Sequence, residues 1–489
     1  MTVDHVEART GAYADSVTLM QVSSRAARTD GVDAALVAMA TQLNLDLLDG
    51  MRFTRPDSVG PNDLLVALRA RDDNALAAGL AVVADALAAR PSATGGSPSE
   101  LPPRTVSAAA RATGPALALI SVPGQHAFTE AMDALDAGCD VMIFSDNVPV
   151  DQEIRLKDVA AERGLLVLGP DCGTAVVGGV GLGFSHTLDP GPVGLVAASG
   201  TGAQQVLCLL DAAGVGVTAA LGVGGRDLSA AVAGRSTRAA LAALDEDAST
   251  ELIVLVSKPP DPAVADELRS YALTLKTPVQ FALIGRGRPD LTTATEQVLH
   301  ALGVDVPEWP HYTGEQPSPR AGALRGLFAG GTLCDEAMII ASERLGPISS
   351  NIPLRPEWAI DPQTPSSGHV MIDFGDDELT AGRPHPMIDQ SLRLARLAVE
   401  ASDPTTAVIL LDVVLGHGAH PDPAAGLAPA IAAVHAAGDV TVVVTIIGAK
   451  ADPQDLNAQA AALRAAGAHV FTSNAQAARF ACDLIASER

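Results

Sequence analysis

Aromatic residues are scarce in this chain of 489 residues, at 3% of positions, although hydrophobic residues make up 48%. Small residues, above all alanine, valine, leucine and glycine, therefore supply most of the apolar material. A chain of this kind buries surface through many small side chains, as layered α/β folds do. Its length exceeds what one hydrophobic core supports, so we expect several domains.

Cysteine is also scarce, and the spacing of the cysteines argues against two kinds of stabilising site, a structural zinc site and a disulfide framework. The five cysteines, Cys139, Cys172, Cys208, Cys334 and Cys482, lie far apart and form no CxxC or CxxH pair. Neither a structural zinc site nor a disulfide framework is indicated by this spacing. No metal site is predicted from cysteine.

Positive charge is in deficit, with 32 Lys and Arg against 57 Asp and Glu, for a formal net charge of −25. Without a basic stripe, nucleic acid and anionic membrane surfaces are not expected as partners. No apolar run reaches the ~18 uncharged residues of a membrane span, and no leader-like segment opens the sequence. We therefore expect a cytoplasmic protein that binds any anionic substrate locally.

The dominant pattern is a short apolar run, a glycine-containing turn and a stretch of helical period, which predicts an α/β fold with buried parallel sheets. Predicted strands of this type include residues 116–122, 140–145, 192–199, 252–260, 369–375, 407–414 and 441–448. Ligands of such sheets bind beyond the carboxyl ends of the strands. The residues that follow each run are therefore the candidates for a site.

Irregular stretches rich in proline, glycine and serine suggest where the domains meet. Residues 90–107 and 304–322 read as linkers, and a weaker break falls at 186–192. The resulting division is an N-terminal α/β region with its linker (1–107), two central α/β domains (108–190 and 191–308) and a C-terminal α/β region (309–489).

A glycine-rich turn after one predicted strand is suited to an anion. The stretch LVAASGTGAQQVL carries the strand into Ser199, Gly200, Thr201 and Gly202 and then into a predicted helix. Such a corner presents backbone N–H groups at the positive end of a helix dipole. It lacks the lysine of a P-loop and the third glycine of a dinucleotide fingerprint. Phosphate binding and a plain tight connection both remain open.

Other strand ends carry side chains with two interpretations each. Cys172 in GPDCGT is either a thiol activated by a helix end or a small buried residue. Asp376 and Asp377 either hold Mg²⁺ or cap a helix. Arg226 either binds an anion or forms an ion pair near Asp227.

The stretch GHGAHPDPA contains a further glycine-rich turn, with Gly416, His417 and Gly418. The nearby His420 and Asp422 suggest metal ligands, but spacing within a glycine- and proline-rich loop is weak support for them. Contact with phosphate through His417 and an ordinary loop are the alternatives.

The motifs occur in a familiar order. ISVPGQHAFTEAMDALDAG, GPDCGT, GPVGLVAASGTGAQQ and GVGGRD follow one another as in the succinyl-CoA synthetase alpha subunit. DFGDDELTAGRPHPMID and VILLDVVLGHGAHPDPAAGL resemble the ligase domain of the beta subunit, fused onto the same chain. With MIFSDNV, VSKPP and GGTL also present, the sequence resembles the FdrA proteins over roughly residues 12–485.

The resemblance implies a CoA-binding Rossmann-like domain followed by two flavodoxin-like ligase domains. It also implies a subunit of oxamate carbamoyltransferase in allantoin and purine catabolism, working beside two further protein subunits and commonly as a homo-oligomer. That enzyme interconverts oxalurate plus phosphate with oxamate plus carbamoyl phosphate. No cofactor is required for this reaction, while CoA and Mg²⁺ remain open.

The sequence departs from the synthetases at one decisive place. Their Gly-His-Ala-Gly-Ala loop, whose histidine is phosphorylated, is replaced here by RGRPDLTTATEQVL, and the next histidine is His300. A phosphohistidine relay is therefore not expected. The two helix N-termini that hold phosphate in the synthetases correspond by this resemblance to Ser199–Gly202 and Gly416–Gly418. Together they would form a two-sided phosphate site.

The loop TAGRPHPMID supplies the remaining chemistry under this hypothesis. Flanking prolines restrict Arg383 and His385, so that Arg383 would bind the oxamate carboxylate and His385 would transfer a proton. A rigid loop with a surface histidine is the structural alternative. Two other functions stay open: an acyl-CoA synthetase that binds CoA near residues 121–128 and 145–148, and a non-catalytic scaffold subunit.

Overall fold

The protein is described by a computed structural model covering residues 2–12, 14, 16–56, 59–60, 62–88, 103–314, 317–380, 384–438 and 440–486. Contacts divide the chain into two compact units. One comprises Met1–Arg104 with Thr380–Pro384, and the other comprises Thr105–Leu379 with His385–Arg489. The finer four-part division drawn from the sequence stays a prediction.

The first unit is a three-stranded antiparallel sheet with helices on both faces. Its elements are β1 (Val3–Arg9), α1 (Ser16–Ala27), β2 (Val32–Met39), α2 (Gln42–Gly50), β3 (Leu64–Ala70) and α3 (Asp73–Ala88). β3 lies between β1 and β2 and is antiparallel to both. Leu64, Val66 and Leu68 pack with α1 and α3, whereas Leu65 and Ala67 pack with α2. The alternation of a strand thus explains why β3 is apolar throughout.

The second unit begins with a small parallel sheet of order β4-β5-β6. Its elements are α4 (Val106–Thr113), β4 (Leu117–Ile120), α5 (Gly124–Asp136), β5 (Asp140–Ile143), α6 (Val150–Arg163) and β6 (Val167–Leu168). A hairpin follows, formed by β7 (Thr174–Val177) and β8 (Val180–Gly183), and it joins the next sheet.

The second sheet of this unit has the order β12-β11-β9-β10-β7-β8, and β9 to β12 are parallel to one another. Its further elements are β9 (Pro190–Ala198), α7 (Gly200–Ala212), β10 (Val217–Gly222), α8 (Arg235–Glu246), β11 (Leu252–Ser257), α9 (Pro262–Ala272), β12 (Val279–Leu283) and α10 (Leu291–Ala301). β9 is central, so the helix that follows it starts at the middle of the sheet edge.

The third sheet has the order β13-β19-β18-β17-β14-β16-β15. Its strands are β13 (His311–Tyr312), β14 (Ala323–Phe328), β15 (Ile348–Ser349), β16 (His369–Asp373), β17 (Thr406–Val414), β18 (Thr441–Ile447) and β19 (His469–Phe471). Its helices are α11 (Gly331–Leu345), the single-turn η1 (Pro356–Trp358), α12 (Asp377–Thr380), α13 (Ser391–Ser402), α14 (Pro423–Ala437), α15 (Leu456–Ala465) and α16 (Asn474–Asp483).

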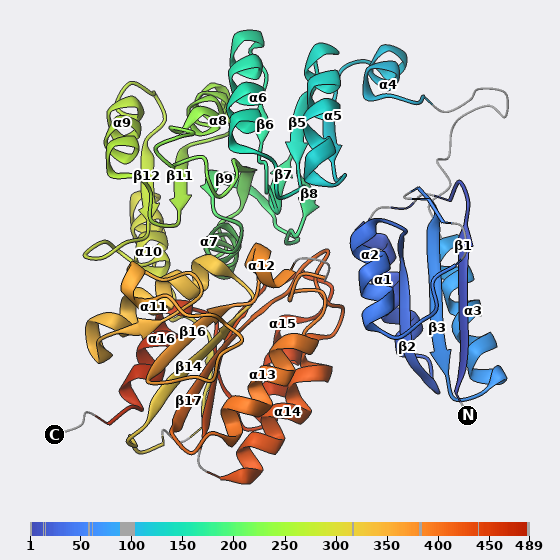
Figure 1. The fold of residues 1–489 in the computed structure, drawn as a ribbon. Helices are drawn as coiled ribbons and strands as arrows, with labels where there is room; N and C mark the ends of the chain where they lie inside the picture. The colour runs from blue at the N-terminus through green and yellow to red at the C-terminus, as the bar shows by residue number, and fades with distance from the viewer. Residues whose placement is uncertain are drawn as a thin grey trace. The chain divides into compact units, whose positions relative to one another are not determined.

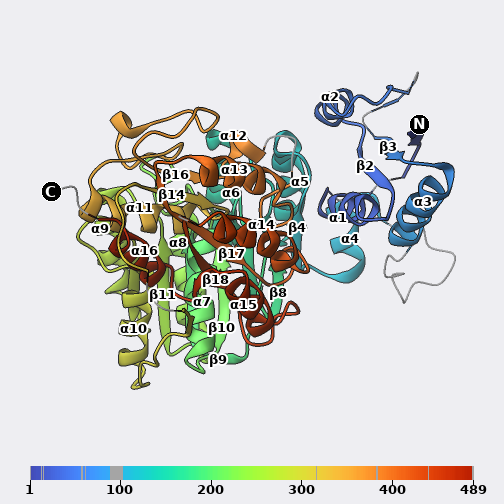
Figure 2. The same ribbon diagram turned by 90° about the horizontal axis from the view of Figure 1, so that it is seen from below.

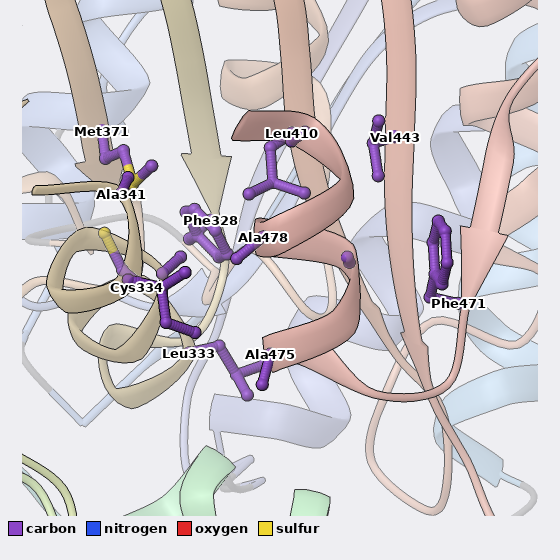
Figure 3. Packing of buried hydrophobic residues seen from close by; sticks show 14 of the residues in the cluster. Phe328, Leu333, Cys334, Ala341, Met371, Leu410, Val443, Phe471, Ala475 and Ala478 are labelled. Carbon is purple, nitrogen blue, oxygen red and sulfur yellow. The ribbon is translucent and has the colours of Figure 1, made fainter. Parts of the chain in front are cut away.

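Helices cover both faces of this third sheet. α13 and α14 lie along one face (Figures 1 and 2), where they pack with the strands in one apolar cluster. α11 and α16 cover the other face, and Figure 3 shows Phe328 beside Ala478 and Leu333 beside Ala475 there. Cys208 of α7 belongs to this same cluster. The packing therefore joins α7 of the second sheet to α11 of the third.

The predicted fold class, α/β with parallel sheets, is confirmed, and each apolar run named above contains a strand. β14 was not predicted, because Arg325 interrupts its apolar sequence. Arg325 is nevertheless only 1% exposed, since Glu400 at 2.8 Å and Asp403 at 3.1 Å pair with it. Among the described residues, no helix has the length and apolar content that crossing a bilayer requires.

The buried Arg325 gives a test of the third sheet. Replacing it in Arg325→Met leaves Glu400 buried with Arg396 as its remaining cation, so we expect a loss of about 3 kcal/mol in the free energy of unfolding. Arg344→Met removes the exposed ion pair with Asp483 and should cost at most about 1 kcal/mol. Urea titration followed by tryptophan fluorescence measures both. Equal losses would contradict the role assigned to Arg325.

Candidate functional site

The turn at the end of β9 is a capped helix start, as predicted. Ser199 is the N-cap of α7, and its Oγ accepts a hydrogen bond from the Gly202 N–H at 3.0 Å. The N–H groups of Gly200 and Thr201 belong to the first turn, which has no acceptor one turn earlier in the helix. Within the described part of the chain, neither N–H has a partner. Gly200 is exposed, so its N–H can meet a ligand.

The helix N-terminus that faces α7 belongs to α11. Ser199 Oγ lies 2.7 Å from Thr332 Oγ1, so the two first turns are joined directly. A β-carbon placed on Gly330 would lie 2.6 Å from Thr201 Cγ2, which only glycine avoids. The N–H groups of Gly331 and Thr332 lie in the first turn of α11 and have no partner among the described residues.

Asp412 at the end of β17 holds the β14–α11 turn in place. Its carboxylate accepts hydrogen bonds from the N–H groups of Ala329 at 2.6 Å and Gly330 at 2.9 Å. The guanidinium of Arg393 pairs with the same carboxylate at 2.7 Å. Both side chains are buried, and burial raises the pKa of Asp412 while the charge of Arg393 opposes that rise. The turn thus presents its remaining N–H groups in a fixed orientation.

The prediction that Gly416–Gly418 forms the second helix N-terminus is wrong. This loop follows β17, but the next helix, α14, starts only at Pro423 with Asp422 as its cap. The N–H of Gly416 already donates to Gln454 Oε1 at 3.0 Å, and that of His417 donates to the Ser185 carbonyl at 2.7 Å. These two donors hold the loop against Gln454 and Ser185.

The histidines of the same loop are engaged within the protein. His417 Nε2 lies 3.0 Å from Thr187 Oγ1, and His420 Nδ1 accepts a hydrogen bond from the Asp422 N–H at 3.0 Å. Gly418 has a φ of +79°, which glycine adopts without strain. No metal-sized cluster of three acidic, histidine or cysteine side chains occurs among the residues that the structure describes.

His385 lies beside the α11 turn, whereas Arg383 is outside the described residues. The Nδ1 of His385 accepts the Met387 N–H at 3.2 Å, which places the ring proton on Nε2. Its ring centroid lies 5.6 Å from that of Phe184. Loss of solvation, with a smaller effect of Arg393, lowers the pKa of His385 to about 4. The imidazole is therefore neutral at pH 7.

Asp373, at the end of β16, is a neighbour of His385 that the sequence did not single out. A β-carbon on Gly375 would lie 2.9 Å from His385 Nε2 and 3.1 Å from Asp373 Oδ1. Asp373 is 6% exposed, and its Oδ1 accepts the Gly375 N–H at 2.9 Å. Burial raises the pKa of this carboxyl to about 8. Only the fold reveals this environment.

Two further carboxyl groups near Lys258 also have raised pKa values. Loss of solvation raises the pKa of Asp171 to about 7, and the charge of Asp377 adds to the effect. The pKa of Asp335, on α11, is raised to about 7 by burial. The charge of Lys258 opposes both shifts, and its ammonium forms no hydrogen bond or ion pair among the described residues. An accessible cation therefore lies among these carboxyls.

Arg226, Cys172 and Asp376 all have contacts within the protein. Arg226 donates to the Val148 carbonyl at 2.7 Å and pairs with Glu153 at 2.9 Å. Glu153 and Asp227 both pair with Lys157, so this ion pair lies in the neighbourhood of Asp227, as one of the two alternatives predicted. Burial raises the pKa of Cys172 to about 12, so its thiol stays protonated. Asp376 Oδ1 accepts the Glu378 N–H at 3.1 Å, as a capping residue does.

The segments proposed for CoA lie side by side at the ends of β4 and β5. Ser145 Oγ donates to the Val122 carbonyl at 2.5 Å. A β-carbon on Gly124 would lie 2.1 Å from the Asp146 carbonyl oxygen, so the loops are in close contact. His300, the histidine nearest to the altered relay loop, lies in the last turn of α10 and is exposed.

Comparison with known proteins gives matches over the whole chain. Residues 327–484 match the family described as CoA-ligase, and residues 1–102 match the family described as AllF, heavy metal-associated domain. Over 510 aligned residues the sequence is 36% identical to the uncharacterized protein YahF of Escherichia coli K12, covering 97% of each chain.

More distant relatives match part of the chain. The sequence is 29% identical over 160 residues to the succinate–CoA ligase alpha subunit of Aquifex aeolicus, covering 32% of this chain and 51% of that one. It is 27% identical over 170 residues to the malate–CoA ligase alpha subunit of Methylorubrum extorquens, covering 33% and 56%. The solved structure of PH0766 from Pyrococcus horikoshii aligns with a TM-score of 0.28 at 15% identity, covering 76% of this chain and 83% of that one.

The donor set of the N-terminal unit does not fit a heavy metal. Residues 1–102 contain no cysteine and a single histidine, His5. The Nε2 of His5 lies 3.7 Å from the Oε2 of Glu7. Soft metals select thiolate ligands, and these are lacking here. We therefore derive no metal chemistry from this unit.

The close approach of the two helices gives a test that needs no substrate. In Gly330→Ala the new methyl group meets Thr201, so we expect a loss of about 1–3 kcal/mol in stability. In Gly200→Ala the methyl group enters space with no atom within 4 Å, so stability should be retained. Thermal unfolding compares the two variants. A stable Gly330→Ala protein would show that the helix ends do not meet as described.

Proposed function

Since this chain belongs to the family of the Escherichia coli protein YahF, we propose that it transfers an acyl group to or from inorganic phosphate held between the N-termini of α7 and α11. The observation that carries the proposal is the meeting of these helix ends through Ser199 and Thr332. The C-terminal CoA-ligase domain, residues 327–484, supplies one of the two helices.

The helix ends provide what a phosphate dianion needs. Each contributes about half a positive charge, together with unpartnered N–H groups at Gly200, Thr201, Gly331 and Thr332. Lys258 adds an accessible cation among neighbouring carboxyls. In a chain with a net charge of −25, such local donors are the means by which an anion can be bound.

The specific reaction that we propose is the carbamoyl transfer of oxamate carbamoyltransferase. A phosphate oxygen attacks the ureido carbonyl carbon of oxalurate, the bond from that carbon to the oxamate nitrogen breaks, and carbamoyl phosphate forms. The attacking hydrogen phosphate carries the proton that the leaving nitrogen takes up. Orientation and charge stabilisation are therefore the main tasks of the protein.

The side chain of His385, beside the α11 turn, adds to the proposed site. His385, neutral at pH 7, is proposed to relay the proton to the leaving nitrogen through hydrogen bonds. Arg383 is proposed to bind the oxamate carboxylate. No cofactor is required by this reaction, and we propose that two further protein subunits and a second copy of the chain assemble with it in the cytoplasm.

An acyl-CoA synthetase is the second candidate. The similarity of a 160-residue segment to a succinate–CoA ligase alpha subunit favours it. In that case CoA would bind beside Ser145 and Gly124, where the loops after β4 and β5 meet. The absence of a histidine from the RGRPDLTTATEQVL loop weighs against phosphoryl transfer of the synthetase type.

The experiment is an assay for carbamoyl phosphate made from oxalurate and phosphate, with the chain alone and with its partner subunits. Gly200→Met places a side chain in the open space before α7 and should lower the rate at least about 100-fold while the fold is kept. Gly50→Met, also in open space but in the other unit, is the matched control and should be fully active.

Thermal shifts distinguish the two candidate functions. Phosphate or carbamoyl phosphate should raise the melting temperature under the carbamoyltransferase proposal, and Gly200→Met should abolish that shift. Stabilisation by CoA, together with no carbamoyl phosphate in any assembly, would favour the synthetase instead.

A further inference from the structure

Building on the proposed phosphate site, we propose that Asp373 must carry a proton for the ends of α7 and α11 to bind an anion, so that in alkaline solution, where Asp373 is ionised, anion binding takes up one proton at this carboxyl. The proposal stands on the position of one unpartnered oxygen of the Asp373 carboxyl, beside the first turn of α11.

The backbone of Asp373 is held rigidly. It is the last residue of β16, in register with Phe328, the last residue of β14. Its N–H donates to Asn351 Oδ1 at 3.0 Å, and its carbonyl accepts from Asn351 Nδ2 at 2.9 Å. The amide of Asn351 thus acts as a clamp on both sides of the residue. The side chain of Asp373 is therefore presented from a fixed point at the carboxyl edge of the sheet.

One oxygen of this carboxyl accepts a hydrogen bond and the other does not. Oδ1 accepts the Gly375 N–H, whereas Oδ2 has no hydrogen-bond partner among the described residues. A β-carbon on Gly331 would lie 2.6 Å from Oδ2, so this oxygen lies against the first residue of α11. The residue is more than nine-tenths buried. An unpartnered oxygen thus faces the helix end at which we place the anion.

Most of the charges around Asp373 disfavour its ionised form, and only Arg393, among the described residues that we name here, acts in the opposite sense. Asp335 on α11, Asp412 on β17 and Asp376 after β16 all add negative potential. Arg393 on α13 is already paired with Asp412, and His385 is neutral. Burial, as the largest cause, raises the pKa of Asp373 to about 8. At neutral pH the carboxyl is therefore protonated before any ligand arrives.

The protonation state decides what the α11 end offers to an anion. A neutral Asp373 can donate its O–H to an anion oxygen, whereas an ionised one places negative charge where the anion must bind. The bound anion in turn raises the pKa of Asp373 further, because the two effects are reciprocal. Affinity should hence be constant well below pH 8 and should fall tenfold per pH unit above it.

Sulfate is the probe, because its charge does not change between pH 6 and pH 9.5 and it shares the shape of phosphate. Calorimetric titration of the full chain should give a dissociation constant that rises about tenfold per unit above pH 8. Repeating the titration at pH 9 in buffers of different ionisation enthalpy should show uptake of close to one proton. This second readout needs no variant.

Two variants test whether Asp373 is the group that takes up the proton. Asp373→Asn keeps a donor without a titrating group, so sulfate affinity should lose its pH dependence above pH 8. Asp335→Asn is the matched control, because Asp335 lies on α11 and its pKa is also raised, to about 7. It should keep the fall in affinity above pH 8. Loss of the dependence in Asp335→Asn alone would overturn the assignment.

The remaining outcomes also decide the proposal. A sulfate affinity that is independent of pH in the unaltered chain, or no sulfate binding at all, contradicts it. Proton-linked sulfate binding without any carbamoyl transfer would leave the role of Asp373 intact and reject the proposed function. Should Asp373→Asn fail to fold, the proton count of the unaltered chain still decides.

Discussion

The first turns of α7 and α11 can meet only because glycine occupies both sides of the contact. A side chain at Gly330 would strike Thr201, and one at Gly202 would lie 2.9 Å from Thr332 Cγ2. The hydrogen bond between Ser199 and Thr332 joins the helices at this point. Three features position these two helix ends. They are the sheets, the apolar cluster to which Cys208 of α7 and the residues of α11 belong (Figure 3), and the hydrogen bonds from the β14–α11 turn to Asp412.

Electrostatics at this point rely on the backbone rather than on basic side chains. The chain is strongly acidic, and Asp335 on α11, Asp373 beside it and Asp171 near Lys258 all have raised pKa values. At neutral pH the carboxyl of Asp373 is mostly protonated and those of Asp171 and Asp335 are partly protonated, which reduces the negative charge that would otherwise repel an anion. Helix dipoles and Lys258 then supply the attraction. The same arrangement makes binding sensitive to pH.

The sequence predicted one of the two helix N-termini of the proposed site. The α7 turn was recognisable because an unbroken apolar strand runs directly into Ser199 and two glycines. The α11 turn has the same form, but Arg325 interrupts the strand before it, and the partner that lets Arg325 be buried, Glu400, lies 75 residues away in the chain. Local patterns cannot reveal such a distant pairing. The resemblance to the synthetases predicted a helix start at Gly416–Gly418, but α14 begins only at Pro423. The N–H groups of Gly416 and His417 donate instead to Gln454 and Ser185, and such distant partners are not visible in the local sequence.

A crystal structure of the protein grown in phosphate tests the central claim most directly. The account predicts one phosphate within hydrogen-bond distance of the N–H groups of Gly200, Thr201, Gly331 and Thr332, with no phosphorylated histidine. Phosphate bound instead at the Gly416–Gly418 loop, or helix ends that stay empty under saturating phosphate, would contradict it.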